Sequence, residues 1–167
     1  VALVREAHPE RNAFEIKATI MNAADLNVTV DPISINPDSP LAPISLIGAG
    51  LVDVEKAVNL PVAAWVEDDE YETKQAALSF GLERMTETTS FTKTVTLKNF
   101  SDADKTYDLR IEERYMNDVD TGAVSFDIPR SVTVAANTVT TFEVTMTVDP
   151  SKLHEWTLEN PFSQDDL

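Results

Sequence analysis

The hydrophobic pattern divides the chain into a helical first part and a strand-rich second part. Up to residue 61, apolar residues recur three or four positions apart between loops that contain proline. From residue 76 onward, apolar and polar residues alternate. The first spacing predicts amphipathic helices, and alternation predicts strands that bury one face. The change falls within residues 47–58, where Gly48 and Gly50 allow the backbone to turn sharply.

Two helices are predicted near the start of the chain. The first covers residues 1–7 and ends before His8-Pro9, because the residue before a proline is disfavoured in a helix. The second begins after Asn12, whose side chain can cap it, and Glu15 completes a capping box. Its apolar stripes are so wide that we expect it to pack inside a larger body. The stripes are Ala13, Ile16, Ile20 and Ala24, and Phe14, Ala18 and Met21, with Glu15, Lys17, Thr19 and Asn22 as the polar surface.

Residues 25–46 contain four prolines among Asn, Asp and Ser, which predicts an extended surface loop with a short edge strand at 27–30. A last short helix is expected to follow the two glycines. Asp53 can cap it, Val54, Ala57 and Val58 would face one way, and Pro61 prevents its extension.

The second part is predicted to form roughly seven short antiparallel strands in a two-sheet sandwich. Residues 62–66 fit either a linker or a first strand. The last strand places Phe142, Val144, Met146 and Val148 on its inner face. Further strands are expected at residues 78–80, 91–98, 106–115, 124–128 and 132–134, with turns at 99–105, 117–122, 129–130 and 135–137.

The predicted fold class is therefore α+β, a short helical segment followed by an all-β antiparallel sandwich. The helical segment covers residues 1–61 and the sandwich residues 62–150. Residues 151–167 lose the alternation and are expected to be an irregular, truncated tail. A final strand of the sandwich has either been cut off there or is supplied by residues 62–66.

Charge and composition exclude several classes of partner. The chain has 13 Lys and Arg against 29 Asp and Glu, a net charge of −16, which disfavours nucleic acid and anionic membranes. It has no cysteine, so a disulfide framework and a thiolate metal site are excluded. No apolar run approaches the roughly 20 residues that span a bilayer. No signal peptide is visible in the sequence and the first residue is not Met, so we expect an excised piece of a longer protein.

The sequence predicts no catalytic, cofactor-binding or metal-binding residue and no cofactor. His8 lies at a helix end, where a capping or turn role is expected, and His154 lies in the tail near Trp156, where packing is expected. None of the serines stands in the Gly-x-Ser-x-Gly turn of α/β-hydrolases.

Two acidic runs invite a calcium hypothesis. Residues 67–70 are four adjacent carboxylates without the spacing or glycine of a calcium loop, which favours a solvated turn. Residues 117–122, Asn-Asp-Val-Asp-Thr-Gly, resemble part of such a loop, but Val119 and Ile128 stand where oxygen ligands are required. A hairpin turn needs the same Asp and Gly. A calcium-stabilised module using Asp118 and Asp120 stays open as an alternative.

Three runs of the first part resemble, in order, the end of a subtilisin-like serine peptidase domain. They are Leu-Val-Arg-Glu-Ala-His-Pro at 3–9, Glu-Ile-Lys-Ala-Thr-Ile-Met-Asn-Ala-Ala at 15–24, and Gly-Ala-Gly-Leu-Val-Asp at 48–53. In that family a Gly-Thr-Ser-Met-Ala-x-Pro motif opens the preceding helix with the nucleophilic serine. This chain begins just after that place and carries none of the triad motifs. The resemblance therefore implies a serine endopeptidase as parent and an inactive fragment here.

The second part resembles the fibronectin-III-like domain that follows the catalytic domain in bacterial cell-envelope subtilases. The runs that carry this resemblance are residues 90–99, 106–109, 132–134 and 138–148. It implies an extracellular or cell-surface bacterial location, with the remainder of the peptidase domain and the parent's protein or peptide substrates as partners. We then expect the chain to expose an apolar patch, or to bury one by dimerisation. The alternative is a non-catalytic adhesion or protein-binding sandwich with helical decoration.

Overall fold

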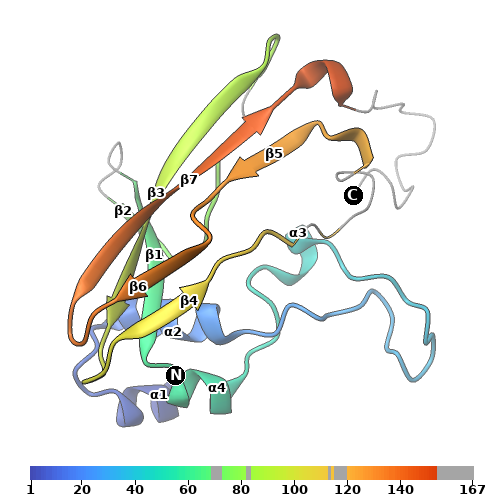
Figure 1. The fold of residues 1–167 in the computed structure, drawn as a ribbon. Helices are drawn as coiled ribbons and strands as arrows, with labels where there is room; N and C mark the ends of the chain where they lie inside the picture. Colours follow the sequence, from blue (N-terminus) through green and yellow to red (C-terminus); the bar gives the residue numbers. More distant parts are fainter. Residues whose placement is uncertain (69–72, 82–83, 113, 115–119, 154–167) are drawn as a thin grey trace.

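The computed structural model describes residues 1–68, 73–81, 84–112, 114 and 120–153. Four α-helices precede seven β-strands in this part of the chain (Figure 1). The helices are α1 Ala2–Ala7, α2 Ala13–Ala23, α3 Ile44–Ile47 and α4 Val54–Asn59. The strands are β1 Val62–Asp68, β2 Thr73–Gln75, β3 Thr89–Asn99, β4 Lys105–Asp108, β5 Val124–Asp127, β6 Ser131–Val134 and β7 Val139–Val148, followed by a 3-10 turn at Pro150–Lys152.

The strands form two antiparallel sheets. The larger has the order β2-β1-β3-β7-β5, and the smaller pairs β4 with β6. The longest ladder joins β3 and β7, in which Val95 lies opposite Phe142. The predicted α+β, mostly-β, sandwich-like fold is thereby confirmed. Residues 62–66 belong to β1, which lies between β2 and β3, so of the two interpretations the first strand is the correct one.

β1 is buried on both of its faces because it lies between the small sheet and α2. Val62 packs with Leu97, Val132 and Val134 in the core between the sheets. Ala63 and Trp65 lie on the opposite face of β1 from Val62 and pack against Ala18 of α2. Successive strand residues face opposite sides of a sheet, so one strand serves both clusters. A third apolar cluster, Val4, Ile16, Ala23 and Ala57, holds α1, α2 and α4 together.

Local signals in the sequence set the ends of the helices. Asn12 Oδ1 accepts a hydrogen bond from Glu15 N at 2.9 Å, and Glu15 Oε2 accepts one from Asn12 N at 2.8 Å. This is the predicted capping box. Asp53 Oδ1 likewise accepts from Lys56 N at 2.8 Å and begins α4.

The structure corrects two expectations about side-chain burial. Glu15 and Thr19 were expected on the polar surface of α2 but are buried, because both make hydrogen bonds within the protein. Val54 was expected on the buried side of α4 with Ala57, yet it is 40% exposed. Only Ala57 and the partly buried Val58 pack against the helical cluster.

The structure also corrects three predicted elements. Residues 27–30 form no strand but one isolated bridge, Thr29 with Leu41, and the unpredicted α3 follows. Residues 78–80 are irregular, since β2 already occupies the edge beside β1. β4 ends at Asp108 because its partner β6 begins at Ser131, after Pro129. A proline cannot continue the ladder.

Candidate functional site

Of the two histidines, the structure describes only His8, and its side-chain partner there is a carboxylate. His8 ends α1, as predicted, and its Nδ1 lies 3.5 Å from Glu10 Oε1. His8 Nε2 is buried and has no hydrogen-bond partner within the described residues. His154, with its predicted packing role, lies outside the described residues.

The acidic runs likewise form no cluster of ligands in the part of the chain that the structure covers. No group of three or more His, Asp or Glu side chains is arranged to hold a metal ion among the described residues. Asp120 is exposed, and Asp118 lies outside them. Glu67 accepts from Trp65 Nε1 at 3.1 Å and pairs with Lys74 at 3.2 Å. The hydrogen bond from Trp65 and that from Lys74 hold the pKa of Glu67 below its ordinary value.

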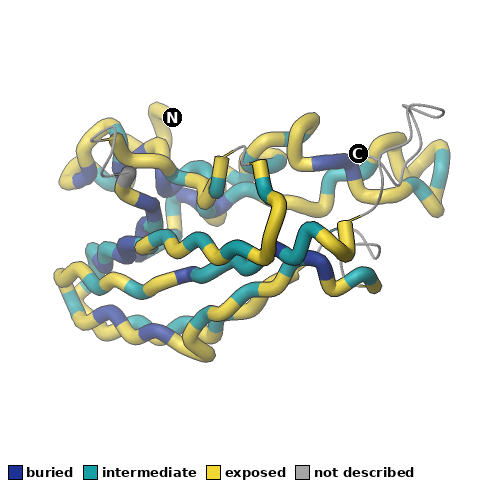
Figure 2. Tube along the Cα trace, turned by 90° about the horizontal axis from the view of Figure 1, so that it is seen from above, coloured by how far each residue is buried: buried dark blue, intermediate teal, exposed yellow. Residues whose placement is uncertain are grey.

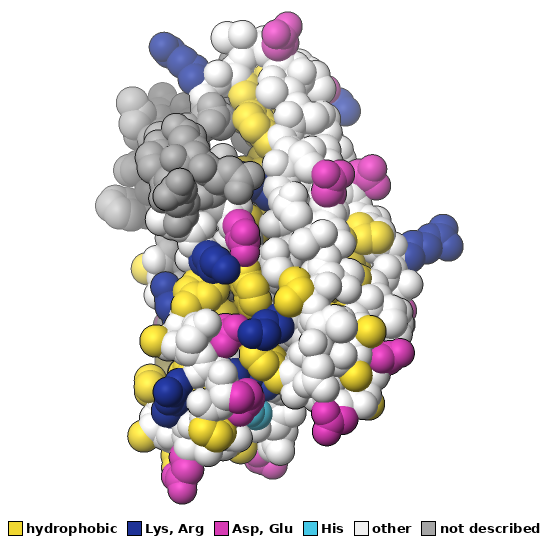
Figure 3. All heavy atoms as spheres, turned by 90° about the vertical axis from the view of Figure 1, so that its left-hand side faces the viewer, with side chains coloured by type: hydrophobic (Ala, Val, Ile, Leu, Met, Phe, Trp, Pro, Cys, Tyr) yellow, Lys and Arg dark blue, Asp and Glu magenta, His cyan; other side chains and the backbone are white. Residues whose placement is uncertain are grey.

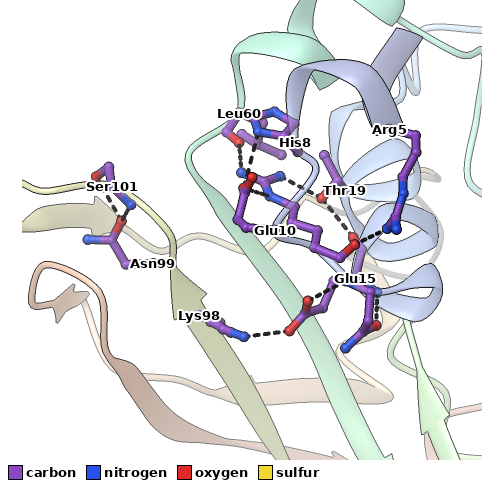
Figure 4. A network of polar contacts seen from close by, with 11 residues as sticks. Arg5, His8, Glu10, Glu15, Thr19, Leu60, Lys98, Asn99 and Ser101 are labelled. Atoms are coloured by element: carbon purple, nitrogen blue, oxygen red, sulfur yellow. Dashed lines mark hydrogen bonds and ion pairs between the residues drawn. The ribbon is translucent and has the colours of Figure 1, made fainter. Parts of the chain in front are cut away.

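The largest fully buried side chain among the described residues is that of Arg11, in the turn between α1 and α2, and its partners Glu10, Thr19 and Leu60 come together there (Figure 4). Arg11 is 1% exposed. Arg11 Nη1 donates to Thr19 Oγ1 and Nη2 donates to the Leu60 carbonyl, both at 2.7 Å. Nε lies 3.5 Å from Glu10 Oε1. Burial lowers the pKa of Arg11 from its ordinary value, while Glu10 opposes that shift.

Glu15 connects this network to the large sheet. Its Oε1 accepts from Lys98 Nζ of β3 at 2.6 Å, and its backbone carbonyl accepts from the Thr19 hydroxyl at 2.7 Å. Burial raises the pKa of Glu15, but the hydrogen bonds from Lys98 and from the Asn12 N–H outweigh it, so the pKa lies below its ordinary value. The network thus joins α1, α2, the end of α4 and β3 by charged contacts.

An arm formed by residues 25–42 extends away from the helices (Figure 1). Asp25 pairs with Leu51 at its base, and Thr29 bridges Leu41. From the other side, the Arg114 guanidinium donates to the Leu26 carbonyl at 3.0 Å and the Val28 carbonyl at 3.2 Å. Figure 2 shows that the arm is mostly exposed. The arm is therefore held at its base by both parts of the chain while its surface faces solvent.

Exposed apolar side chains are concentrated in the helical part. Of the 16 large apolar side chains that are exposed in the described structure, 12 lie within residues 1–61. In the part of the molecule that carries the helices, hydrophobic side chains reach the surface between charged ones (Figure 3). The most exposed members are Val1 84%, Ile35 78%, Leu46 73%, Leu51 64%, Ile44 62%, Leu3 61% and Ile33 60%. The sequence signal for most of this surface is the set of isoleucines, leucines and valine in residues 26–46, whereas the apolar stripes of α2 pack inside the chain.

A shallow hollow of about 470 Å³ lies between the start of β3 and the end of β7. It contains the carboxylates Glu87 and Asp149 and the hydroxyl Ser151. The Ser151 hydroxyl donates to Asp149 Oδ1 at 2.6 Å and lowers the pKa of that carboxyl. Asp149 thus caps the 3-10 turn by accepting from the backbone N–H and the hydroxyl of Ser151, and no histidine is among the residues that line the hollow.

No helix in the described ranges has the length and apolar character needed to cross a membrane. No protein-family profile and no curated protein matches the sequence. The residues described above are therefore the basis of any functional conclusion.

Proposed function

We propose that the chain is the C-terminal piece of a secreted or cell-surface subtilisin-like serine peptidase. Residues 1–61 are the end of its catalytic domain, and the sandwich is its fibronectin-III-like domain. The parent hydrolyses peptide bonds with a Ser-His-Asp triad. This piece is non-catalytic and supports the domain that carries the triad.

The exposed apolar surface of residues 1–61 carries the proposal. Large exposed apolar patches on soluble proteins mark places where another protein surface packs. Leu3, Leu51 and Val52 lie in two of the three segments whose sequences resemble the end of the peptidase domain, and most of the other exposed apolar side chains lie in residues 26–46, between those segments. The rest of the peptidase domain is the partner of matching chemistry, because it would bury these side chains as a continuation of the same core.

The antiparallel two-sheet arrangement supports the fibronectin-III-like assignment of the sandwich. The alternative function, an adhesion or protein-binding sandwich, would use the same apolar surface to hold a separate protein. Under that alternative the surface would serve an unrelated partner, and the preceding gene sequence would encode no peptidase motif. The two functions are therefore distinguished by what lies upstream of Val1.

The test is to express the gene product with the residues that precede Val1 and to treat it with a fluorophosphonate, which reacts with an activated serine. We expect one labelled serine within a Gly-Thr-Ser-Met-Ala segment shortly before Val1, and no labelling of the 167-residue chain. An unrelated upstream domain without labelling would contradict the proposal. A substituted serine in an otherwise matching segment would contradict peptidase activity and retain the domain assignment.

A further inference from the structure

Two side chains at and just after the end of β3 contact the start of α2 and the turn before it. Lys98, in β3, forms the ion pair with Glu15. The Phe100 ring, just after β3, lies 4.2 Å from Arg11 Cζ in a cation–π contact. Lys98 Nζ is also 4.7 Å from the centre of the Phe100 ring. The turn is therefore fixed by contacts with the sandwich as well as by the helices themselves.

We propose that Lys98 is a positioning residue, which holds the α1–α2 turn through Glu15 and Arg11 and thereby sets how α1 lies against α2 and α4.

Glu15 is suited to this role because each of its groups has a separate partner. Oε2 accepts from the Asn12 N–H at the helix start, and Oε1 accepts from Lys98. Its side chain is only 8% exposed, whereas that of Lys98 is 36% exposed. Hydrogen bonds to charged groups are about twice as strong as neutral ones. Removing the Lys98 ammonium would leave a largely buried carboxylate with the backbone N–H alone.

Arg11 transmits the position of Glu15 to α1. Thr19 donates to the Glu15 carbonyl and accepts from Arg11 Nη1. In the other direction, Arg5 of α1 donates through Nη1 to the Arg11 carbonyl. Glu10, between His8 and Arg11, pairs with both. The charged groups that face Glu15 are therefore Lys98 from β3 and Arg11 from the turn.

The consequence for catalysis rests on the proposed function, because α1 would then be the last turns of the helix that the nucleophilic serine opens. A sandwich that fixes α1 would hold the serine in register with the rest of the triad. Small displacements of catalytic groups are costly, since the reaction requires a near-attack geometry.

Native-state amide hydrogen exchange of the ¹⁵N-labelled 167-residue chain tests the positioning role directly. The reporter amides are His8 N–H, which donates to Val4, and Arg11 N–H, which donates to His8. Lys98→Met is expected to speed their exchange about fivefold while the β5–β7 ladder keeps its protection. Lys98→Arg should restore the reporters. Lys152→Met removes the same charge from an exposed pair and should change neither region.

Wild-type exchange at His8 and Arg11 in Lys98→Met would overturn the proposal. Equal acceleration in the β5–β7 ladder would overturn it too, since that would be a general loss of stability. A second measurement is the ¹³C titration of the Glu15 carboxyl in Glu10→Gln, which removes the carboxylate that lies beside His8 and Arg11. The amide shifts of His8 and Arg11 should follow this titration, and shifts that ignore it would contradict the coupling.

The link to catalysis is tested separately in the longer protein. There, Lys98→Met should lower kcat and leave KM unchanged, with Lys152→Met as control. If Lys98→Met changes amide exchange at His8 and Arg11 but leaves kcat unchanged, Lys98 positions the α1–α2 turn without affecting catalysis, and the catalytic part of the proposal is overturned. Absence of hydrolysis by the unaltered longer protein would instead be a failure of the proposed function.

Discussion

Lys98 and Glu15, 83 positions apart in the sequence, are joined by a contact of 2.6 Å between Nζ and Oε1. Because Lys98 belongs to β3 and Glu15 to the first turn of α2, the pair connects the helical part to the large sheet. It also explains why a glutamate that the helical pattern places on the surface is buried. The first two predictions below concern this network.

Replacing Arg11 with methionine should destabilise the chain by about 3 kcal/mol, because the Leu60 carbonyl and Glu10 lose a buried charged partner. Arg11→Lys keeps the charge but loses the planar arrangement of donors, so an intermediate loss is expected. Urea denaturation followed by circular dichroism measures both. Equal stability of Arg11→Met and the wild type would show that the network contributes nothing.

Glu15 should make stability depend on pH in the acid range. Its pKa in the folded chain lies below the ordinary value of 4.5. Its contribution is therefore complete above about pH 4.5 and is lost as the pH falls through the folded pKa. Glu15→Gln should cost about 1–2 kcal/mol at pH 7 and less at pH 3. Thermal unfolding at both pH values measures the difference, and a pH-independent cost would argue against the ion pair.

Gly50→Ala should destabilise the chain more than Gly48→Ala. Gly50 has φ +103°, and an added Cβ would lie 2.3 Å from the Asp25 carbonyl oxygen, so the backbone bridge to the arm would have to move. Gly48 has φ +58° with open space around it. We expect a loss of about 3 kcal/mol at Gly50 and about 1 kcal/mol at Gly48, measured by denaturant midpoints. Equal losses would mean that the close approach to Asp25 is relieved at no cost.

Asn99→Ala should cost about 2–3 kcal/mol, because it leaves buried carbonyls without a donor. Asn99 is 1% exposed, and its Nδ2 donates to the carbonyls of Ala103, Val134 and Ala135. Its Oδ1 accepts from Ser101 N. Asn99→Asp keeps this acceptor alone and serves as the comparison. Chemical denaturation distinguishes the two, and a near-neutral Asn99→Ala would show that water replaces the amide.

Replacing Ile44 and Leu46 together with serine should lower the binding of a hydrophobic dye to the chain, or its self-association measured by light scattering. Both side chains are more than 60% exposed, so stability should change by less than about 0.5 kcal/mol per site. Val139→Ser, at a 53% exposed position in the sandwich, is the matched control and should leave dye binding unchanged. A strictly monomeric wild-type chain that binds no dye would count against a role of the exposed apolar surface of residues 1–61 in binding another protein surface.

The sequence by itself determined the features that depend on neighbouring residues. The capping box of Asn12 and Glu15, the cap at Asp53 and the turn glycines act within a few positions, and the alternation in β3 and β7 is a local pattern. All were predicted, and the structure confirms them. The wide apolar stripes of α2 indicated a helix that packs on more than one side, and within the chain Ile16 and Ala18 do pack in two different clusters.

Only the tertiary structure decided which polar side chains would be buried and where strands would end. Thr19 and Glu15 occupy helix positions that look solvent-facing, and they are buried because Arg11 folds back from the preceding turn and Lys98 reaches Glu15 from 83 positions away. Leu109 continues the alternation after β4 and still donates to the Arg130 carbonyl at 2.9 Å, but the pairing ends there because Pro129 comes next in the partner segment. Hydrogen-bond partners far apart in sequence are chosen by packing, and periodicity along one segment contains no information about them.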